Sequence, residues 1–561
     1  MSAGIGSTRW SQSRLLLLWR HQNVTVGPQT DRPVWMPTNG RTTVGGRYPA
    51  ANVGGIVSVE VSVPKVSVVV PAYNCGGHIG KLVASLLRQS LPASEFETIF
   101  VDDGSTDDTG ERLDRLAAAH PHIQVLHTEN SGWPSRPRNL GIERARGEYV
   151  FFADDDDWFA DEALERLYEC AKTYGADIAI GKMAGHGRGV PRELFRSNRF
   201  DATLANAPLI DSLTCHKLFR RSFLNEHGLR FPEGGKRRLE DHSLVVRAYF
   251  LSRRTCVLSD YTCYHHVRRG DAGNVTATRL DPASYFASIH DALDIVDAST
   301  EPGQLRDRLH RRWLRNEMLN RLRGKRLLTA PEDWLEQVAL ETQKVIQDRF
   351  TPGVAAGLPP LQRAVAYLTE RGRIADLRRL ARWEAGIAVR ATIEDYQLAD
   401  RAVTMTVAAE LRSADQPVGF RSDNGRDVLV LPVDEVAPEV LDSTAQVRKA
   451  RLDVVARRRE TGDEIILPVS FRTERVADPN EADTVHLVHR ATTTIDVGTL
   501  NGGRTRGSWF IRARITNAGW TEDAQPPLLF ICRTDGARPR IRDQRRPWNW
   551  LRSAVGRRIR R

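Results

Sequence analysis

Residues 148–158 of this 561-residue chain read EYVFFADDDDW, an apolar run that ends abruptly in four aspartates. The run 149–153 is rich in aromatic and β-branched residues and too short for an independent helix, so it predicts a fully buried strand. Asp154, Asp155, Asp156 and Asp157 follow at its carboxyl end, where open α/β sheets bind ligands. Adjacent carboxylates repel one another unless a cation joins them, and hard divalent ions bridge carboxylates to phosphates. The stretch therefore predicts a metal-diphosphate site.

Helix capping is the plainer interpretation of the same acids. Asp157, Asp161 and Glu162 precede a helical pattern, and acids favour a helix N-terminus. Capping needs one or two acids, however, and not a run directly after a buried strand. The metal-diphosphate interpretation is therefore the stronger one.

Strand and helix patterns alternate on the N-terminal side of this stretch. Such alternation implies a parallel sheet with right-handed crossovers, and thus an α/β fold. A second acidic run, DDGSTDD at 102–108, also follows a predicted strand. The predicted strands are 65–71, 96–101, 123–127 and 149–153. The predicted helices are 79–91, a helix that includes Leu113 and ends at His120, and 140–146. Residues 129–139 are predicted to form a loop broken by glycine and proline.

The acidic run 102–108 has two interpretations. It is either a polar turn that caps a helix through Ser105 or Thr106, or a nucleotide contact in which a carboxylate accepts from a base N–H or a ribose hydroxyl. The sequence lacks the EF-hand spacing, the G-x-G-x-x-G fingerprint and the P-loop. A dinucleotide fold and a P-loop enzyme are therefore not supported.

Four segments together resemble the catalytic domain of glycosyltransferase family 2, the inverting type with a GT-A fold. They are VSVVVPAYN (66–74), VDDGSTDDT (101–109), PRNLGIERARGEYVFFADDDDW (137–158) and LEDH (239–242). The resemblance covers residues 64–280. The wider layout is similar to the poly(ribitol-phosphate) N-acetylglucosaminyltransferases of wall teichoic acid synthesis.

The resemblance implies a binding site for a UDP-sugar donor. Pro71 and Tyr73 would border the nucleobase, and Asp103, with Asp102 beside it, would contact uracil and ribose. Two further residues match positions that contact the donor sugar nucleotide in the teichoic acid enzymes, namely Asn130 and Arg138.

The resemblance also implies the catalytic groups. Asp154, Asp155 and Asp156 correspond to the D-x-D motif, in which Asp154 would hold ribose or sugar hydroxyls and Asp156 would ligate Mn²⁺ or Mg²⁺ on the diphosphate. The middle residue of this motif is often small, so Asp155 departs from the pattern. This departure leaves open whether Asp154 or Asp156 ligates the metal. Asp241 would be the general base that deprotonates the acceptor hydroxyl. Without the resemblance, Glu240 and Asp241 would be interpreted as an ordinary helix cap.

Basic residues flank the predicted base. The run Lys236, Arg237 and Arg238 either draws a phosphate-bearing acceptor or is a solvated loop. In the segment 262–270, one of two histidines would be a third metal ligand or a diphosphate contact, and two arginines would screen the leaving group. These four residues are His265, His266, Arg268 and Arg269.

The remaining chain divides into segments that differ in composition and residue pattern. Residues 1–60 predict a disordered leader, 61–280 the GT-A domain, 281–390 a helical linker, 391–535 one or two β-sandwich modules and 536–561 a basic aromatic tail. The linker periodicity indicates core packing and not a cofactor site. The β modules would serve acceptor-polymer binding or homo-oligomerisation, which the sequence does not separate.

The charge and the cysteines indicate which partners and which cellular location to expect. The net charge is +11, but ten arginines and one aspartate lie between Arg538 and Arg561, so the basic character belongs to the tail and nucleic acid is not an expected partner. The tail predicts peripheral contact with an anionic membrane, with a solubilising tail as the alternative. The six cysteines form no CxxC pair, and the longest apolar run near the N-terminus, 15–19, is too short for a signal peptide or a membrane span. A cytoplasmic location, peripheral at the inner face of the plasma membrane, is expected.

The sequence thus predicts an inverting, metal-dependent glycosyltransferase that moves a sugar, with GlcNAc the leading choice, from a UDP-sugar to a hydroxyl of a cell-wall or surface polymer such as teichoic acid. One alternative is transfer of another sugar to a lipid or protein acceptor. A second is a noncatalytic carbohydrate-binding scaffold with a relict donor fold.

Overall fold

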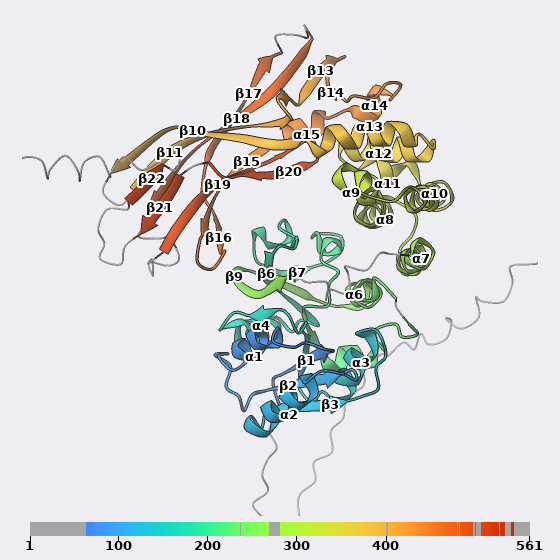
Figure 1. Ribbon diagram of the computed structural model, residues 1–561, viewed down its shortest axis with the longest axis vertical. Coiled ribbons are helices and arrows are strands. Elements are labelled where there is room, and N and C mark those ends of the chain that lie inside the picture. Colours follow the sequence, from blue (N-terminus) through green and yellow to red (C-terminus); the bar gives the residue numbers. More distant parts are fainter. Residues whose placement is uncertain are drawn as a thin grey trace, which may run out of the picture. The chain divides into compact units, whose positions relative to one another are not determined.

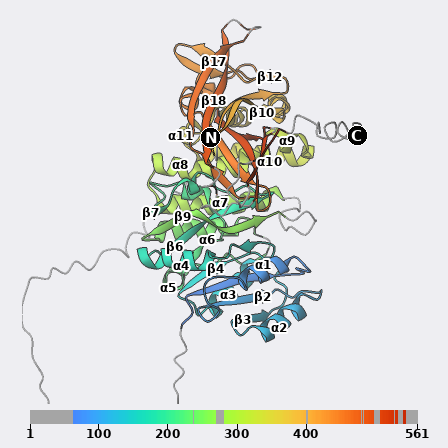
Figure 2. The same ribbon diagram turned by 90° about the vertical axis from the view of Figure 1, so that its left-hand side faces the viewer.

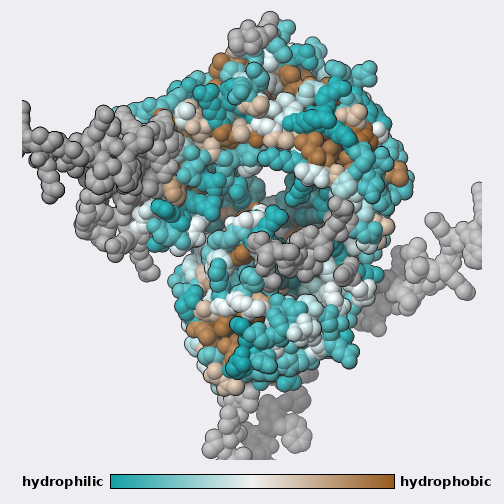
Figure 3. Space-filling model, in the orientation of Figure 1, coloured by the Kyte–Doolittle hydropathy of each residue, from teal (hydrophilic) through white to brown (hydrophobic). Residues whose placement is uncertain are grey.

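The computed structural model describes residues 63–235, 237–268, 281–399, 402–478, 481, 483–496, 500, 507–526, 528–532 and 540–543. The predicted leader at 1–60 lies outside these residues, and so does the tail beyond 543 with its predicted membrane contact. Within the described ranges, no helix has the length and apolar character needed to cross a membrane. The face in Figure 3 is mostly hydrophilic, with apolar residues in small scattered groups.

A nine-stranded mixed sheet forms the N-terminal part of the fold (Figure 1). Its strands are β1 (Val66–Ala72), β2 (Phe96–Asp102), β3 (Ile123–His127), β4 (Tyr149–Phe152), β5 (Trp158–Phe159), β6 (Ile178–His186), β7 (Arg199–Ala202), β8 (Leu218–Arg220) and β9 (Thr255–Val267). Their order is β3-β2-β1-β4-β8-β6-β9-β5, with β7 paired to β9. The four predicted strands, β1 to β4, pair in parallel as expected, whereas β8 is antiparallel to β4 and β6.

Helices cover this sheet: α1 (Ile79–Leu86), α2 (Thr109–Ala119), α3 (Ser135–Arg144), α4 (Ala163–Tyr174), α5 (Arg221–Glu226) and α6 (Glu240–Leu251). Helix α3 packs on β1 and β2, and α4 packs on β6 and β9. All residues of β2 and β4 are buried, which is typical of strands covered on both faces.

Helix α3 corrects the predicted loop at 129–139, because it begins at Ser135. Pro137 lies in its first turn, where backbone N–H groups have no partner within the helix and proline is tolerated. Gly141 lets α3 approach β1, since a Cβ there would lie 2.2 Å from Val69 Cγ1. Arg138 therefore lies on a rigid helix that is pressed against the sheet.

The predicted helical linker is confirmed. It contains α7 (Pro282–Ser299), α8 (Gln304–Trp313), a π-helical turn η4 (Leu314–Met318), a 3₁₀ turn η5 (Leu319–Arg321), α9 (Gly324–Leu328), α10 (Glu332–Arg349), α11 (Pro352–Ala356), α12 (Pro360–Glu370) and α13 (Ile374–Ala385). Prolines stand at the starts of several helices, where the missing N–H costs nothing. Helix α7 packs on α6, so the linker contacts the helix that carries Asp241.

Two antiparallel sheets follow the linker. The seven-stranded sheet holds β10 (Ile387–Ala399), β11 (Ala402–Ser413), β12 (Gln416–Pro417), β13 (Gly419–Asp423), β14 (Arg426–Leu429), β17 (Ser470–Ala477) and β18 (Thr484–Asp496). The six-stranded sheet holds β15 (Arg451–Arg458), β16 (Glu464–Ile466), β19 (Gly507–Asn517), β20 (Trp520–Ala524), β21 (Leu528–Cys532) and β22 (Arg540–Asp543). The sheets contact each other through β15 and β18 and through β11 and β19. Figure 2 shows β17 and β18 of the first sheet side by side.

Two details differ from the strand pattern expected here. The apolar run 465–471 is divided at Pro468, so that β16 and β17 belong to different sheets. Proline cannot donate to a strand ladder, which explains the break. Strand β22 pairs with β21, so sheet structure continues past residue 535, the predicted end of the β modules.

Candidate active site

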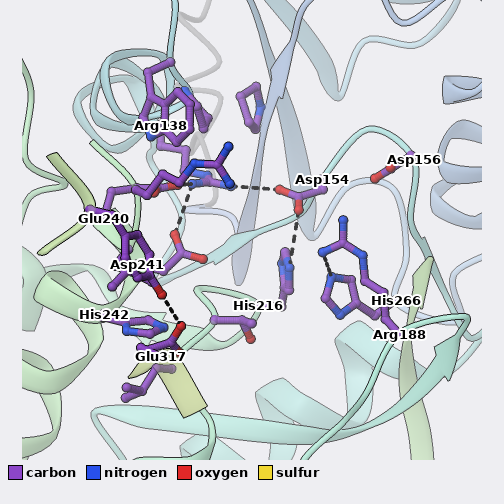
Figure 4. Close-up of a pocket in the computed structure, with 18 of the residues that line it drawn as sticks. Arg138, Asp154, Asp156, Arg188, His216, Glu240, Asp241, His242, His266 and Glu317 are labelled. Carbon is purple, nitrogen blue, oxygen red and sulfur yellow. Dashed lines mark hydrogen bonds and ion pairs between the residues drawn. The ribbon is translucent and has the colours of Figure 1, made fainter. Parts of the chain in front are cut away.

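A cavity of about 1560 Å³ brings most of the predicted site residues together (Figure 4). Asp156 and Asp241 both line it. The predicted chemistry requires the donor site and the base to share one cavity in this way. The predicted residues in its lining are Pro71, Tyr73, Asp103, Asn130, Arg138, Asp154, Asp155, Asp156 and Asp241.

Parallel strand pairing explains why the acids meet. Ala72 at the end of β1 is in register with Asp102 at the end of β2, and the N–H of Asp103 donates to the carbonyl oxygen of Ala72 at 2.9 Å. Strand β4 is parallel to β1, so Asp154 emerges at the same edge of the sheet. The cavity therefore lies at the carboxyl ends of the central strands, where α/β sheets bind ligands.

Asp103 and Tyr73 form the end of the cavity predicted for the nucleobase. Tyr73 is 48% exposed, whereas Asp103 is buried and accepts from the N–H and hydroxyl of Ser131 at 3.0 and 2.9 Å. Burial raises the pKa of Asp103. Gly104 has φ +68°, and a Cβ there would lie 2.7 Å from the backbone nitrogen of Asn130, so only glycine fits this close approach.

Asp102 is placed differently from its neighbour. It lies outside the cavity lining, where it accepts from the N–H of Ser105 at 3.0 Å and lies 2.9 Å from His127 Nδ1. The structure thus separates the two acids: Asp102 shapes the turn, whereas Asp103 reaches the cavity. Neither Ser105 nor Thr106 caps a helix, because α2 begins at Thr109 after the N-cap residue Asp108.

The four aspartates that follow β4 have different surroundings. Asp154 accepts from Arg138 Nη2 at 2.8 Å, and Asp155 accepts from the thiol of Cys75 at 2.6 Å. Asp157 is fully buried and accepts from the N–H of Val267 at 2.7 Å. The capping interpretation is wrong for Asp157, because α4 begins at Ala163 and its N-cap residue, Glu162, makes no side-chain capping bond.

Asp154, Asp157, His216 and His266 form a group that fits a metal ion, with one possible ligand atom from each within 4.8 Å of the others. His216 Nε2 lies 3.5 Å from Asp154 Oδ2 and 3.9 Å from Asp157 Oδ2. Asp157 Oδ2 is buried, and apart from the interaction of this carboxyl with the Tyr264 hydroxyl it has no hydrogen-bond partner within the described part of the chain. An orphaned carboxylate oxygen of this kind is what a bound cation would satisfy.

The tautomer of His216 suits ligation. Its Nδ1 lies 3.2 Å from the carbonyl oxygen of Phe152, which can only accept, so Nδ1 carries the hydrogen and Nε2 keeps its lone pair toward the aspartates. Burial lowers the pKa of His216 and keeps the ring neutral. Burial, His216 and Arg188 lower the pKa of His266 to about 3.

Arg138 links Asp154 to the two acids at the start of α6. Its buried guanidinium donates to Asp154 at 2.8 Å, Asp241 at 3.1 Å and Glu240 at 3.2 Å. Burial alone would raise the pKa of Asp154, but neighbouring positive charge, including that of the Arg138 guanidinium, holds it well below its usual range. Arg138, predicted as a donor contact, thus holds three carboxylates in place while it lines the cavity (Figure 4).

Glu240 and Asp241 lie in the first turn of α6, where acids are favoured. Their N-cap residue is Leu239, whose side chain makes no capping bond. Asp241 Oδ2 also accepts from the N–H of Cys215 at 3.2 Å. Burial, followed by the charge of Asp241, raises the pKa of Glu240 to about 7.

The structure separates the two predicted histidines. His266 lines the cavity, whereas His265 stacks on Trp158 at a centroid distance of 4.9 Å and lies outside the lining. Arg188, which sequence reasoning missed, lines the cavity and donates to His266 Nε2 at 3.0 Å. Its only signal is a glycine-flanked loop, GHGRG at 185–189.

Of the two arginines predicted after β9, the structure describes only Arg268. Arg268 is exposed and outside the lining, and Arg269 lies outside the described residues. Of the basic run before α6, Arg237 pairs with Asp291 at 3.3 Å, and Arg238 lines the cavity. Lys236 also lies outside the described residues.

The linker supplies one wall of the cavity, which sequence reasoning also missed. The wall includes Tyr285 of α7, Glu317 of η4, Arg321 of η5 and Trp334 of α10. These residues lie within helical patterns of ordinary appearance, and no local motif marks them.

Comparison with known proteins agrees with this arrangement. Residues 67–228 match the family model for glycosyl transferase family 2, and residues 282–381 match the model for the glycosyl transferase TarS linker domain. The chain is 35% identical over 237 residues to a poly(ribitol-phosphate) beta-glucosyltransferase of Bacillus spizizenii, a match that covers 42% of this chain and 37% of that protein. It is 31% identical to the Staphylococcus aureus poly(ribitol-phosphate) beta-N-acetylglucosaminyltransferase TarP, over 40% of this chain and 70% of TarP.

A solved structure shares the fold. S. aureus TarS residues 1–349, crystallised with UDP-GlcNAc, superposes with a TM-score of 0.51 at 24% identity and covers 63% of this chain and 98% of that one. The chain spans well under half the length of the Bacillus relative. With the catalytic-domain match, the linker match and the coverage of TarP taken together, the chain belongs to glycosyltransferase family 2.

Proposed function

We propose that this protein is an inverting glycosyltransferase that moves a sugar from a UDP-sugar to a hydroxyl of a polyol-phosphate polymer such as teichoic acid. The observation that carries the proposal is the shared cavity, in which Asp154 and Asp156 lie with Tyr73, Asp103 and the candidate base Asp241.

The donor would lie along the carboxyl edge of the sheet. Tyr73 offers an exposed ring to the base, and Asp103 offers a buried carboxylate to N–H or hydroxyl groups. The diphosphate would then reach Asp154 and Asp156, with Arg188 near His266 as a cationic donor to its oxygens. This assigns to Arg188 the task predicted for Arg268 and Arg269.

A divalent cation fits the residues beside Asp154. The donor set mixes carboxylate oxygens with the Nε2 lone pair of His216, which favours Mn²⁺ over Mg²⁺ because Mg²⁺ takes mainly oxygen ligands. Asp154, Asp157, His216 and His266 would hold the ion, and Asp156 is the further carboxylate predicted to do so. Such an ion would supply positive charge to the leaving diphosphate.

Asp241 would act as the general base. An acceptor hydroxyl is a poor nucleophile, and a carboxylate within hydrogen-bond reach removes its proton as the new C–O bond forms. A single displacement from the side opposite the leaving diphosphate inverts the anomeric carbon. Arg138 and the Cys215 N–H orient the carboxylate for this step.

The relatives suggest the substrates. TarP is named for N-acetylglucosaminyl transfer and the Bacillus relative for glucosyl transfer, both to poly(ribitol-phosphate). We propose GlcNAc as the donor sugar and glucose as its alternative. A cytoplasmic location suits this reaction, and the five described free cysteines, all buried, agree with a reducing compartment.

A screen of nucleotide sugars tests the proposal. UDP release should require a UDP-sugar, a polyribitol phosphate acceptor and Mn²⁺, and it should stop when EDTA is added. Asp241→Asn serves as the control that retains donor binding without transfer. If the wild-type protein neither binds UDP with Mn²⁺ nor transfers any sugar, the enzyme assignment fails and the scaffold alternative remains.

A further inference from the structure

His127 lies between two carboxylates at the end of β3. Its Nδ1 lies 2.9 Å from Asp102 Oδ2, and its Nε2 lies 3.0 Å from Asp114 Oδ1. Strand β3 is an edge strand that pairs with β2, which ends at Asp102, and α2, which carries Asp114, packs on it. These two acids are the charged groups that the neighbouring elements direct at the ring. The proposed function uses neither His127 nor Asp114.

This geometry requires a protonated ring. A neutral imidazole carries a hydrogen on one nitrogen, so it donates to one carboxylate while its other nitrogen turns a lone pair toward the second. The imidazolium donates from both nitrogens, as the two distances require. In agreement, the hydrogen bonds to Asp102 and Asp114 raise the pKa of His127. The ring therefore loses its proton at a higher pH than an ordinary histidine does.

Asp102 connects the histidine to the turn that follows β2. Its side chain is 7% exposed, and its Oδ1 accepts from the N–H of Ser105 at 3.0 Å. Burial opposes its ionisation, but Ser105 and His127 lower its pKa. Gly110, in the first turn of α2, leaves room for the ring, because a Cβ there would lie 3.0 Å from Asp102 Oδ2 and 3.5 Å from His127 Cε1. One buried carboxylate thus links the ring to the backbone of the turn.

The same turn positions both residues predicted for the nucleobase. Asp103 is part of the turn itself. The hydroxyl of Ser105 accepts from the N–H of Asn74 at 3.0 Å, and Asn74 is the residue after Tyr73. A shift of the turn therefore moves Asp103 directly and Tyr73 through Asn74.

We propose that His127 is a positioning residue whose protonated ring fixes Asp102, and with it the turn that presents Asp103 to the nucleobase. The affinity for the donor is then highest while the ring is protonated. It falls as the pH rises and the ring loses its proton, because one of the two hydrogen bonds is lost. His127 lies outside the cavity lining, so it acts on a ligand only through the turn. The inference rests on the proposed function and deepens it, since it makes donor binding depend on pH.

Calorimetry on the full chain tests the role of His127. The probe is UDP-GlcNAc with Mn²⁺ and no acceptor, with UDP-glucose in parallel; UDP is avoided, because its terminal phosphate titrates near about pH 6. The range from about pH 6 to about pH 8.5 starts below the ordinary pKa of histidine and extends well above it. Over this range the Kd of the wild-type protein should rise by about 3- to 10-fold, the loss expected of one hydrogen bond. His127→Gln should give a Kd that does not change with pH, because an amide has no proton to lose.

Asp114→Asn is the second variant, at a side chain that is 62% exposed and therefore tolerant of substitution. The amide oxygen still accepts from the ring but carries no charge, so the rise in Kd should move to lower pH. Glu111→Gln is the matched control, because Glu111 lies one turn earlier on α2 and pairs with Arg115 at 3.7 Å. Its Kd should follow that of the wild-type protein at every pH. Each comparison is repeated in a Glu240→Gln background, since the pKa of Glu240, about 7, falls in the same range.

The outcomes separate the role of His127 from the proposed function. A wild-type Kd that is constant over the range refutes this role, while donor binding stands. A pH dependence that persists in His127→Gln belongs to another group and also refutes it. An Asp114→Asn profile identical to that of the wild-type protein refutes the double hydrogen bond on which the role depends. If the wild-type protein binds neither nucleotide sugar at any pH, the proposed function itself fails, and the role of His127 fails with it.

Discussion

One nitrogen of Arg138 is shared by the two acids at the start of α6. Nη1 lies 3.1 Å from Asp241 Oδ1 and 3.2 Å from Glu240 Oε1. Burial, followed by the charge of Asp241, raises the pKa of Glu240 to about 7, so Glu240 is partly protonated near neutral pH. Asp241 is the candidate base, and the protonation of Glu240 changes the charge beside Asp241.

Replacing Asp241 by Asn tests the base directly. We expect Asp241→Asn to lower kcat for sugar transfer by about 10²- to 10⁴-fold, the usual contribution of a positioned proton acceptor. The affinity for UDP with Mn²⁺, measured by calorimetry, should change little, because Asp241 lies away from the predicted nucleobase end. Transfer at the wild-type rate would rule out Asp241 as the base.

Glu240 gives the reaction a pH signature. Its pKa is raised to about 7, so it holds a proton below pH 7 and becomes negative as the pH rises through that value. Its ionisation adds negative charge beside Asp241 and competes with Asp241 for Arg138. We expect kcat/KM for the acceptor to rise with pH through an inflection near 7, and Glu240→Gln to lack that inflection. The same inflection in both proteins would assign it to another group.

At the scale of an element, helix α3 shows what a local sequence pattern can predict and what it cannot. The apolar strands β1, β2 and β4 could be predicted because each is a short buried run. The start of α3 could not, because PSRPRN carries two prolines and no apolar period. Its helix is stabilised by tertiary contacts: Asn139 Nδ2 donates to the carbonyl oxygen of Phe231 at 2.9 Å, and Arg138 binds acids from two other segments.

The stability of this helix should depend on Arg138. We expect Arg138→Leu to lower the free energy of unfolding by about 3–5 kcal/mol, because it leaves three partly buried carboxylates without their partner. The loss should be smaller at pH 5 than at pH 7, since Glu240, whose pKa is about 7, holds a proton at pH 5 and then needs no cation. Chemical denaturation at the two pH values measures both effects.

Arg144→Leu is the control on the same helix. Arg144 is exposed, and the effect of this substitution should stay within about 0.5 kcal/mol. An equal loss in both variants would mean that the substitutions disturb the helix itself and not the ion pairs of Arg138.

At the scale of the whole molecule, the site depends on segments far apart in the sequence. The D-x-D run, the PAYN segment and the Glu-Asp pair could be predicted because they resemble motifs of glycosyltransferase family 2. His216 and the linker wall could not, because only tertiary packing brings them to the cavity. The linker thus has a part in the site that its periodicity, which indicates only core packing, does not reveal.

Trp313 tests whether the linker supports the base. It is fully buried at the end of α8, with its ring centroid 6.3 Å from that of His242, the residue after Asp241. We expect Trp313→Ala to reduce the free energy of unfolding by about 3–5 kcal/mol, the usual cost of a large cavity in a core. Because His242 then loses its packing partner, kcat for transfer should also fall while the affinity for UDP with Mn²⁺ is kept. Leu340→Ala on α10, at a side chain that is 49% exposed, should change neither quantity. A Trp313→Ala protein that is less stable but transfers sugar at the wild-type rate would limit the linker to a structural role behind the base.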